Sequence, residues 1–398
     1  MRHNTLALIA ASWFLLFAIP CVAETPAPAD EIRKAAEQGD AGAQLTLGFA
    51  YAKGLGVTRD DAEAGKWFRK AADQGNVVAQ YTLGMIYHDG QGVKRDDVEA
   101  VKWFHKAAER GDAVAQLNLG FAYQSGKGVT QDYAEAAKWF RKAAEQGEAI
   151  AQYALGTLYQ DGLGVTQDYA EAIKWTRKAA EQGFAAAQFN LGAMYRTGQG
   201  VTRDYAEAIK WTRQGAEQGY AAAQGLLGMM YRTGQGVTQD HAEAAQWFRK
   251  AADQGISVAQ YTLGMIYHNG EGVTRDDVEA AKWLRKSAEQ GFEAAQFNLG
   301  LAYAKGLGVM RDYAEAANWF RKPADQGHPA AQFYLGLMYR DGQGVARNYA
   351  LAYMWLSLAT AKNYEKARQT LDDLEKKVTP QQRDEAQRIA REWKPIHN

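Results

Sequence analysis

Cysteine, proline and net charge are what this chain has least of. Its 398 residues include one cysteine, Cys21, and seven prolines. One thiol cannot form an intramolecular disulfide, so apolar packing must hold the fold together. Lys plus Arg and Asp plus Glu both number 46. This balance argues against nucleic acid as a partner, because phosphate binding needs a basic surplus, and gives no reason for adhesion to an anionic membrane.

Residue patterns typical of metal sites and catalysis are also missing. The six histidines beyond residue 23 show no His-Glu-x-x-His or similar spacing. No Ser-x-x-Lys or Gly-x-Ser-x-Gly occurs. The Gly-x-Gly segments follow predicted helices, which is the wrong context for a dinucleotide site. The sequence therefore predicts no metal, no cofactor and no catalytic residue, and we expect a protein that is not an enzyme.

A single apolar run stands at the N-terminus. Arg2 precedes the run from Leu6 to Pro20, and Val22-Ala23 offers small residues for cleavage. The run is short for a bilayer span. We expect residues 1–23 to be a Sec-type bacterial signal peptide cleaved after Ala23, which leaves no membrane span in the mature chain and makes the protein periplasmic or secreted. One alternative is a lipoprotein acylated at Cys21, which needs a small residue before the cysteine and is disfavoured by Pro20; another is a buried N-terminal helix.

What the chain does have is a unit of 36 residues, repeated nine times without insertion or deletion. Each copy carries the same markers at fixed offsets, which in the first copy are Ala43-Gln44, Leu47-Gly48, Tyr51, Gly54 to Val57 and Trp67. A period of this length indicates stacked units that bury their apolar faces against neighbours. We predict an all-α solenoid with residues 24–38 as lead-in and half-repeat cap, repeats over 39–362, and capping helices over 363–398.

Two helices per unit follow from the pattern. Ala43, Gln44, Leu47, Gly48 and Tyr51 share one face of a first helix, and Gly48 predicts close approach by a neighbouring helix. The second helix begins at Asp60, and its buried stripe includes Trp67. Glycines end both helices.

Proline and paired acids give two further local predictions. Pro323 lies inside the second helix of the eighth copy, which predicts a kink or early end near residues 318–322. Eight copies place Asp and Glu three apart, as Asp60 and Glu63 do. These pairs could be metal ligands or an acid/base pair, but their place at a helix start favours a capping box, in which each side chain accepts a backbone N–H.

The Ala-Gln marker, the Gly-x-Gly-Val loop, the Asp-x-x-x-Ala-x-x-Trp run and the Ala-Ala-x-Gln-Gly ending together resemble the Sel1-like repeat family, a relative of tetratricopeptide repeats. The resemblance implies a right-handed α/α superhelix that acts as scaffold or adaptor in protein complexes, with the first helices lining its concave face. One exported branch is cysteine-rich and linked to penicillin binding and β-lactamase activity; the present chain lacks its repeat cysteines.

On the helical wheel, three columns of residues lie opposite the buried stripe of the first helices, and the resemblance assigns them to the concave face. Their Met-, aromatic- and Arg-rich composition is typical of peptide binding. The candidate protein-binding residues are Tyr81, Met85, His88, Tyr153, Phe189, Arg196, Met229, Arg232, Tyr261, Met265, His268 and Phe297.

We therefore expect an exported scaffold or adaptor that binds a protein or peptide partner along the concave face. One alternative is a cell-envelope hydrolase of the β-lactamase or penicillin-binding type. Another is a binder of glycan or peptidoglycan strands, for which Trp and Tyr would be platforms. The repeat tryptophans are predicted to be buried, which disfavours the glycan alternative.

Overall fold

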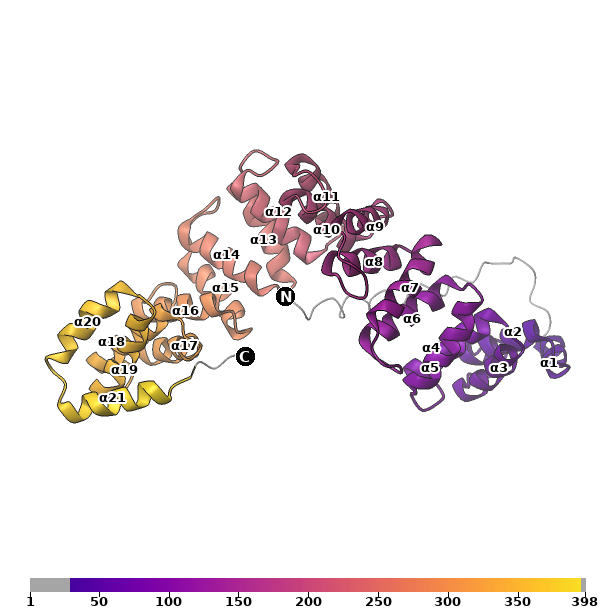
Figure 1. Cartoon of the computed structure of the whole chain (residues 1–398), viewed down its shortest axis with the longest axis horizontal. Coiled ribbons are helices and arrows are strands. Elements are labelled where there is room, and N and C mark those ends of the chain that lie inside the picture. Colours follow the sequence, from indigo (N-terminus) through magenta and orange to yellow (C-terminus); the bar gives the residue numbers. More distant parts are fainter. Residues whose placement is uncertain (1–28, 395–398) are drawn as a thin grey trace. The chain divides into compact units, whose positions relative to one another are not determined.

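The computed structural model describes residues 29–394, and all regular elements in that range are helices (Figure 1). The expected signal peptide, the cleavage site after Ala23 and Cys21 lie outside the described residues. The elements in chain order are α1 Ala29–Glu37, α2 Ala41–Lys53, α3 Asp61–Asp73, α4 Val77–Asp89, α5 Asp97–Glu109, α6 Ala113–Ser125, α7 Tyr133–Glu145, α8 Ala149–Asp161, α9 Tyr169–Glu181, α10 Ala185–Thr197, α11 Tyr205–Glu217, α12 Ala221–Thr233, α13 His241–Asp253, α14 Ser257–Asn269, α15 Asp277–Glu289, α16 Glu293–Lys305, α17 Tyr313–Asp325, α18 Pro329–Asp341, α19 Tyr349–Ala361, α20 Glu365–Glu375 and α21 Pro380–Glu392.

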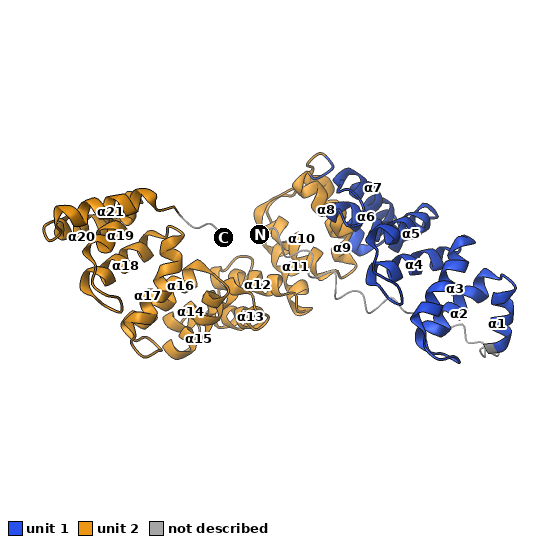
Figure 2. Cartoon of the chain, turned by 90° about the horizontal axis from the view of Figure 1, so that it is seen from below, with its two compact units in different colours: residues 1–151, 163–165 blue, residues 152–162, 166–398 orange. Residues whose placement is uncertain are grey.

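The chain divides into two compact units, shown in blue and orange in Figure 2. Unit 1 comprises residues 1–151 with 163–165, and unit 2 comprises residues 152–162 with 166–398. In each unit a repeat consists of a first helix (the A helices, even-numbered from α2 to α18) and a second helix (the B helices, odd-numbered from α3 to α19). Within residues 29–394, no helix is long and apolar enough to cross a membrane.

Glycine sets the turn between the two helices of a repeat. Gly54 ends α2 in the left-handed conformation with φ 69°, where its N–H donates to the Ala50 carbonyl. The second glycine of the Gly-x-Gly pair has a different task. In the second repeat Gly92 has φ 67° and lies against the backbone of Asp61, at the start of the previous B helix, so that any Cβ would clash. Both glycines are therefore needed, one to end a helix and one to let repeats touch.

The glutamine of the Ala-Gln marker is a buried hydrogen-bonding residue. Gln44 is 4% exposed. Its Nε2 donates to the Ala36 carbonyl at 3.0 Å, and its Oε1 accepts from Gln74 Nε2 at 2.8 Å. Gln44 thus gives a carbonyl at the end of the preceding helix a second hydrogen bond, beside that from the Gly39 N–H, which a buried leucine could not do. The same amide-to-carbonyl bond recurs at Gln80 and Gln116, among others.

The predicted close approach at the Leu-Gly marker is confirmed. A Cβ added to Gly48 would lie 2.7 Å from the ring of Phe68, and one added to Gly84 would lie 2.6 Å from the ring of Phe104. These contacts join the A and B helices of one repeat. The B-helix stripe around Trp67 is buried, as predicted. The spacing shared by these repeats thus places a glycine on the A helix where the phenylalanine ring of the B helix packs.

The capping-box prediction at the B helices is half right. Asp60 Oδ1 accepts from the N–H groups of Ala62 and Glu63, which confirms the cap. Glu63 does not return to the Asp60 N–H, because that N–H donates to the Tyr51 carbonyl of the preceding A helix. The glutamate at this position instead pairs with the lysine three residues on, and in five repeats it accepts from the indole N–H of the core tryptophan, as Glu279 does from Trp283.

The prediction of a kink or early end before Pro323 is wrong about the helix end. The helix α17 continues through Pro323 to Asp325 and has the same 13 residues as the other B helices. Pro323 is buried in its last turn, and its carbonyl accepts from the His328 N–H at 2.9 Å. Packing on both sides therefore outweighs the lost hydrogen bond. Trp319, whose carbonyl would have received that bond, is partly exposed, whereas the other eight repeat tryptophans are buried.

The last two helices pack on the end of the ninth repeat. The predicted capping box at the start of α21 is confirmed, because Thr379 Oγ1 accepts from the Gln382 N–H and Gln382 Oε1 accepts from the Thr379 N–H. Leu374 and Ala386 are fully buried in the core cluster of the C-terminal repeats. Figure 1 shows α20 and α21 in yellow beside α19. They cover apolar surface that another repeat would otherwise cover.

Candidate binding surface

The A helices present one face to solvent, here called the A-helix face. It consists of the fifth, ninth and twelfth residues of each A helix. It contains every candidate binding residue predicted from sequence. All twelve are partly exposed. By helix they are Tyr81, Met85 and His88 in α4, Tyr153 in α8, Phe189 and Arg196 in α10, Met229 and Arg232 in α12, Tyr261, Met265 and His268 in α14, and Phe297 in α16.

The aromatic side chains of this face bury part of their surface in intramolecular contacts. In unit 2 each ring lies against the side chain that precedes the next A helix. Ring centroids are 5.3 Å apart for Tyr153 and Phe184, 5.6 Å for Phe189 and Tyr220, and 5.2 Å for Tyr261 and Phe292. Such spacing is typical of favourable edge-on and tilted contacts. The rings are therefore fixed in place and still reach solvent with one edge.

Tyr81 in unit 1 has a different environment. Its ring contacts Phe104 at 6.0 Å, and burial together with the nearby Asp112 raises the pKa of its hydroxyl to about 12. Burial likewise raises the pKa of Asp112 and of Glu148, and the charge of Asp112 adds to the effect at Glu148. Acidic groups near a tyrosine make this part of the A-helix face negative, which favours basic groups on a ligand.

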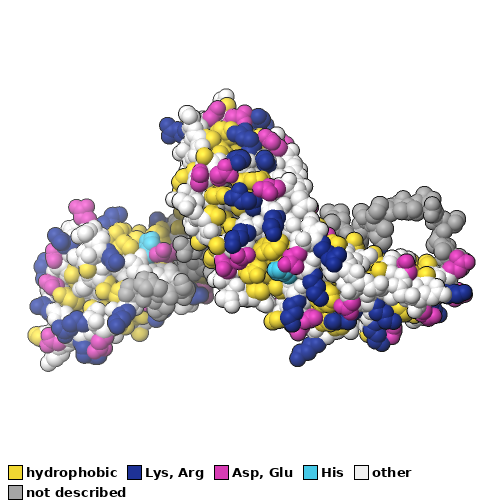
Figure 3. All heavy atoms as spheres, turned by 45° about the vertical axis from the view of Figure 1, so that its right-hand side comes forward, with side chains coloured by type: hydrophobic (Ala, Val, Ile, Leu, Met, Phe, Trp, Pro, Cys, Tyr) yellow, Lys and Arg dark blue, Asp and Glu magenta, His cyan; other side chains and the backbone are white. Residues whose placement is uncertain are grey.

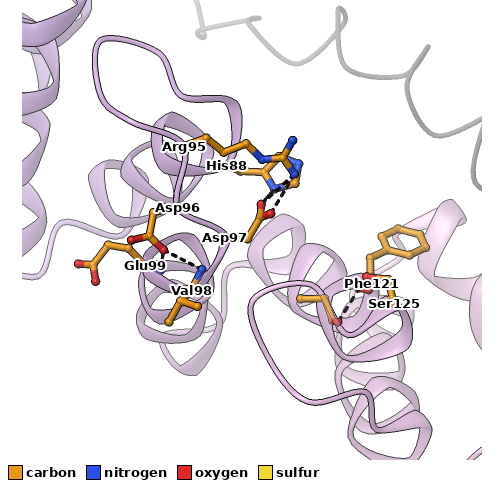
Figure 4. A network of polar contacts seen from close by, with 9 residues as sticks. His88, Arg95, Asp96, Asp97, Val98, Glu99, Phe121 and Ser125 are labelled. Atoms are coloured by element: carbon orange, nitrogen blue, oxygen red, sulfur yellow. Dashed lines mark hydrogen bonds and ion pairs between the residues drawn. The ribbon is translucent and has the colours of Figure 1, made fainter.

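The two histidines take part in matching ion-pair networks. In the second repeat His88 Nδ1 lies 2.9 Å from Asp97, whose other oxygen binds Arg95 at 2.9 Å (Figure 4). In the seventh repeat the corresponding distances from Asp277 are 2.7 Å to His268 and 2.8 Å to Arg275. The Arg275 hydrogen bond lowers the pKa of Asp277, so this carboxylate stays charged.

These networks lack the composition of a metal site. Residues 29–394 contain no group of three or more His, Cys, Asp or Glu side chains placed to hold a metal ion. Each network instead ties the end of an A helix to the start of the B helix in the same repeat. In each network the Nδ1 atom of the imidazole is bound to the carboxylate that also pairs with the arginine.

The sequence reasoning missed one column of the surface. The residues that precede the A helices, here called the N-cap column, differ between the two units. In the first four repeats they are Asp40, Asn76, Asp112 and Glu148, and in the last five they are Phe184, Tyr220, Ile256, Phe292 and His328. The change is visible in the sequence at intervals of 36 residues, but these residues precede the helical pattern from which the surface was predicted.

The two halves of the N-cap column hold the helix start in different ways. Asp40, Asn76 and Asp112 accept from the N–H three residues on, at 2.6, 3.0 and 2.6 Å respectively. Phe184, Tyr220, Ile256 and Phe292 make no side-chain cap. The N-cap column therefore carries polar and acidic groups in unit 1 and apolar, mainly aromatic groups in unit 2, except for His328, whose Nδ1 accepts from the Ala331 N–H.

Charged and apolar groups mix over the molecular surface. Figure 3 shows apolar side chains in yellow among Lys and Arg in dark blue and Asp and Glu in magenta. Of the seven exposed large apolar side chains within residues 29–394, four are matching residues of the second and seventh repeats, namely Val78 with Val258 and Val98 with Val278. The two repeats therefore share exposed valines as well as the histidine network.

The Sel1 repeat family model matches nine consecutive segments: residues 41–76, 77–112, 113–148, 149–184, 185–220, 221–256, 257–292, 293–328 and 329–368. None of the curated proteins matches the sequence.

Two solved structures are similar over most of the chain. A protective antigen of uropathogenic Escherichia coli strains with an SLR fold is 39% identical, with a TM-score of 0.60 over 92% of this chain and 86% of its own. A Sel1 repeat protein from Oxalobacter formigenes is 37% identical, with a TM-score of 0.64 over 79% of this chain and 91% of its own. With nine matched repeats and these neighbours, the chain belongs to the Sel1 repeat family, whose helical repeats commonly serve as protein-interaction scaffolds.

Proposed function

We propose that this protein is an exported scaffold that binds a protein or peptide partner along the A-helix face, the face that the family resemblance makes concave. The observation that carries the proposal is the surface of unit 2, where Met229 and Met265 lie partly exposed beside aromatic rings held by their neighbours. A preorganised apolar surface with polar edges suits an extended or helical peptide, because little side-chain freedom is lost on binding.

Variation between repeats supports the same function. The core positions are nearly identical from copy to copy, since packing constrains them. The A-helix face changes, for example from Phe49 to Met85 to Thr157 at one position, and the N-cap column changes from acidic to aromatic. A surface with a different profile in each repeat can distinguish one partner sequence from another. Nothing in the arrangement of the described residues favours the hydrolase alternative over this one.

A photo-crosslinking experiment tests the proposal. A benzoylphenylalanine would replace Met229 on the A-helix face in one protein and Gln246 on the B helix of the same repeat in another. Gln246 is exposed and remote from the A-helix stripe, so both proteins should fold alike. After illumination in envelope extract, a discrete crosslinked species is expected from position 229 alone. Equal or stronger crosslinking from position 246 would move the binding surface to the B helices.

Export is proposed on the sequence alone, from Arg2, the apolar run and Val22-Ala23. The similar Escherichia coli protein is a protective antigen, which agrees with an exported protein. Intact mass spectrometry of protein recovered from the periplasm or medium tests it. The expected mass corresponds to a chain that begins at Glu24. A mass that retains Met1, or one that shows a lipid on Cys21, would contradict a soluble exported protein.

A further inference from the structure

A small cleft in unit 2 lies at the A-helix face between α14, α15 and α16, with a volume of about 70 Å³. Its floor is apolar and buried, formed by Ala280, Ala281 and Leu284. Met265 and Leu301 form its partly exposed walls. A cleft of this size accepts one aliphatic side chain.

The rim of the cleft carries one positive charge that is not neutralised. His268, Asp277 and Lys305 all line it. Both oxygens of Asp277 are already bound, one to His268 and one to Arg275. Lys305 is exposed, and no ion pair of Lys305 is found within residues 29–394. The rim therefore complements a carboxylate, while the floor complements an aliphatic group.

The second repeat shows what opens the cleft. It has the same methionine, histidine and aspartate, as Met85, His88 and Asp97, at positions five repeats earlier. Where the seventh repeat has Ala281 and Leu284, however, the second has the larger Val101 and Phe104, both buried. Where unit 2 has Lys305, unit 1 has Ser125, whose hydroxyl donates to the Phe121 carbonyl (Figure 4). The second repeat thus supplies a counterpart with the larger floor residues Val101 and Phe104 and with Ser125 in place of Lys305, although Lys127 stands where the cleft has Leu307.

We propose that this cleft holds an aliphatic side chain of the bound peptide, and that Lys305 pairs with an acidic side chain next to it. The partner segment would therefore contain an aliphatic residue followed or preceded by Asp or Glu. This inference rests on the peptide-binding function proposed above and names the chemistry of one of its contacts. The aliphatic group supplies burial and the acidic group supplies selectivity.

Methionine methyl NMR tests the cleft directly. The probe is acetyl-Gly-Leu-Glu-Gly-amide, and its control, acetyl-Gly-Leu-Gln-Gly-amide, differs only in the charge. In protein labelled with ¹³C at the methionine methyls, the Met265 signal should shift saturably on titration, while that of Met85 should not. The Gln peptide should bind about threefold more weakly, which is the effect of one exposed ion pair. Equal shifts at Met85, or equal affinity for both peptides, would overturn the proposal.

Variants taken from the chain's own repeats separate the two contacts. Ala281→Val with Leu284→Phe should abolish the Met265 shift, because the larger side chains fill the cleft as in the second repeat, where they are accommodated. Lys305→Ser should remove the preference for Glu over Gln and keep the Leu-dependent shift. Unchanged circular dichroism verifies folding of each variant; retained binding in the filled variant refutes the cleft. If crosslinking from position 229 succeeds while the Met265 signal stays fixed, the cleft assignment fails and the scaffold function stands.

Discussion

The N-cap column of unit 1 and that of unit 2 occupy the same backbone geometry with opposite chemistry. Asn76 has φ −65° and ψ 115°, and Tyr220 has φ −67° and ψ 109°. In unit 1 a side-chain oxygen binds an N–H of the helix start, whereas in unit 2 the rings of Phe184, Tyr220 and Phe292 pack against the A helix before them and His328 caps its helix through Nδ1. The helix start thus forms at this position with a side-chain cap or without one. The side chain at this position is therefore available to define the surface.

Because the side chains of the N-cap column differ between the two units, we expect the units to prefer different ligands. Unit 1 offers Asp112 and Glu148 beside Tyr81, and unit 2 offers rings and methionines edged by Arg196 and Arg232. A partner of unit 1 should carry basic groups, and a partner of unit 2 should carry apolar and acidic groups. The cleft with Lys305 fits the second pattern.

The largest change in stability is expected when an aromatic ring with several ring neighbours is removed from unit 2. Phe297 lies 5.7 Å from Phe320, 5.0 Å from His328 and 5.8 Å from Tyr334, measured between ring centroids. Phe297→Ala should lower the free energy of unfolding by roughly 2–3 kcal/mol, less than for a fully buried ring. Leu45→Ala, at the same position of the first repeat, is the matched control and should cost less. Chemical denaturation measures both, and an equal loss would remove the distinction between the units.

An exchange of cap types comes next in size. Tyr220→Ala removes the contact with Phe189 and adds no side-chain cap. Tyr220→Asn removes the same contact and adds a side-chain cap like that of Asn76. We expect the Asn variant to be more stable than the Ala variant by about 1 kcal/mol, the usual contribution of an N-cap. Thermal or urea unfolding of the pair decides. Equal stability would mean that the backbone of unit 2 does not accept a polar cap.

How much the sequence predicts depends on whether a feature repeats. The buried Gln44, the close approach at Gly48 and the cap at Asp60 follow from spacing that every copy shares, and all three are confirmed. Pro323 was misjudged because helix propensity is local, while the packing that carries α17 through this residue is tertiary. The hydrogen bond from the Trp283 indole to Glu279 was hidden because it depends on the orientation of the tryptophan ring.

In the candidate surface, too, the repeated features were predicted from the sequence and the features that depend on tertiary packing were not. The wheel identifies which residues of the A helices are partly exposed, since the stripe opposite them is fixed. It does not reveal the cleft, because this depends on the combined volumes of Ala281 and Leu284 on one helix and Leu301 on the next. Nor did it reveal the change in the N-cap column, whose members lie outside the helical pattern. The binding role of the A-helix face stays a prediction.

A smaller effect is expected where the aromatic column of unit 2 is interrupted. At Gly225 a Cβ would meet no atom within 4 Å, and the following N-cap residue is Ile256. Gly225→Ala should therefore raise the free energy of unfolding by about 0.5–1 kcal/mol through helix propensity. Gly192→Ala in the adjacent repeat is the opposing control, because its Cβ would clash with Thr212 Oγ1 and the Ala208 carbonyl. Melting temperatures that fall for both would show that the gap at Gly225 is needed for packing.

The smallest effect concerns the pH response of unit 1. Burial raises the pKa of Asp112, although backbone hydrogen bonds from Ala115 and Val114 oppose the shift. The folded chain therefore holds this proton more tightly than the unfolded chain, so the stability it contributes is present below the ordinary carboxyl pKa and is lost as pH rises through the raised value. Asp112→Asn keeps a cap and removes the charge. Its melting temperature relative to the parent should rise as the pH increases from about 4, the ordinary carboxyl pKa, through the raised pKa of Asp112. A difference between Asp112→Asn and the parent that is flat or falls with pH would show that desolvation does not control the ionisation of Asp112.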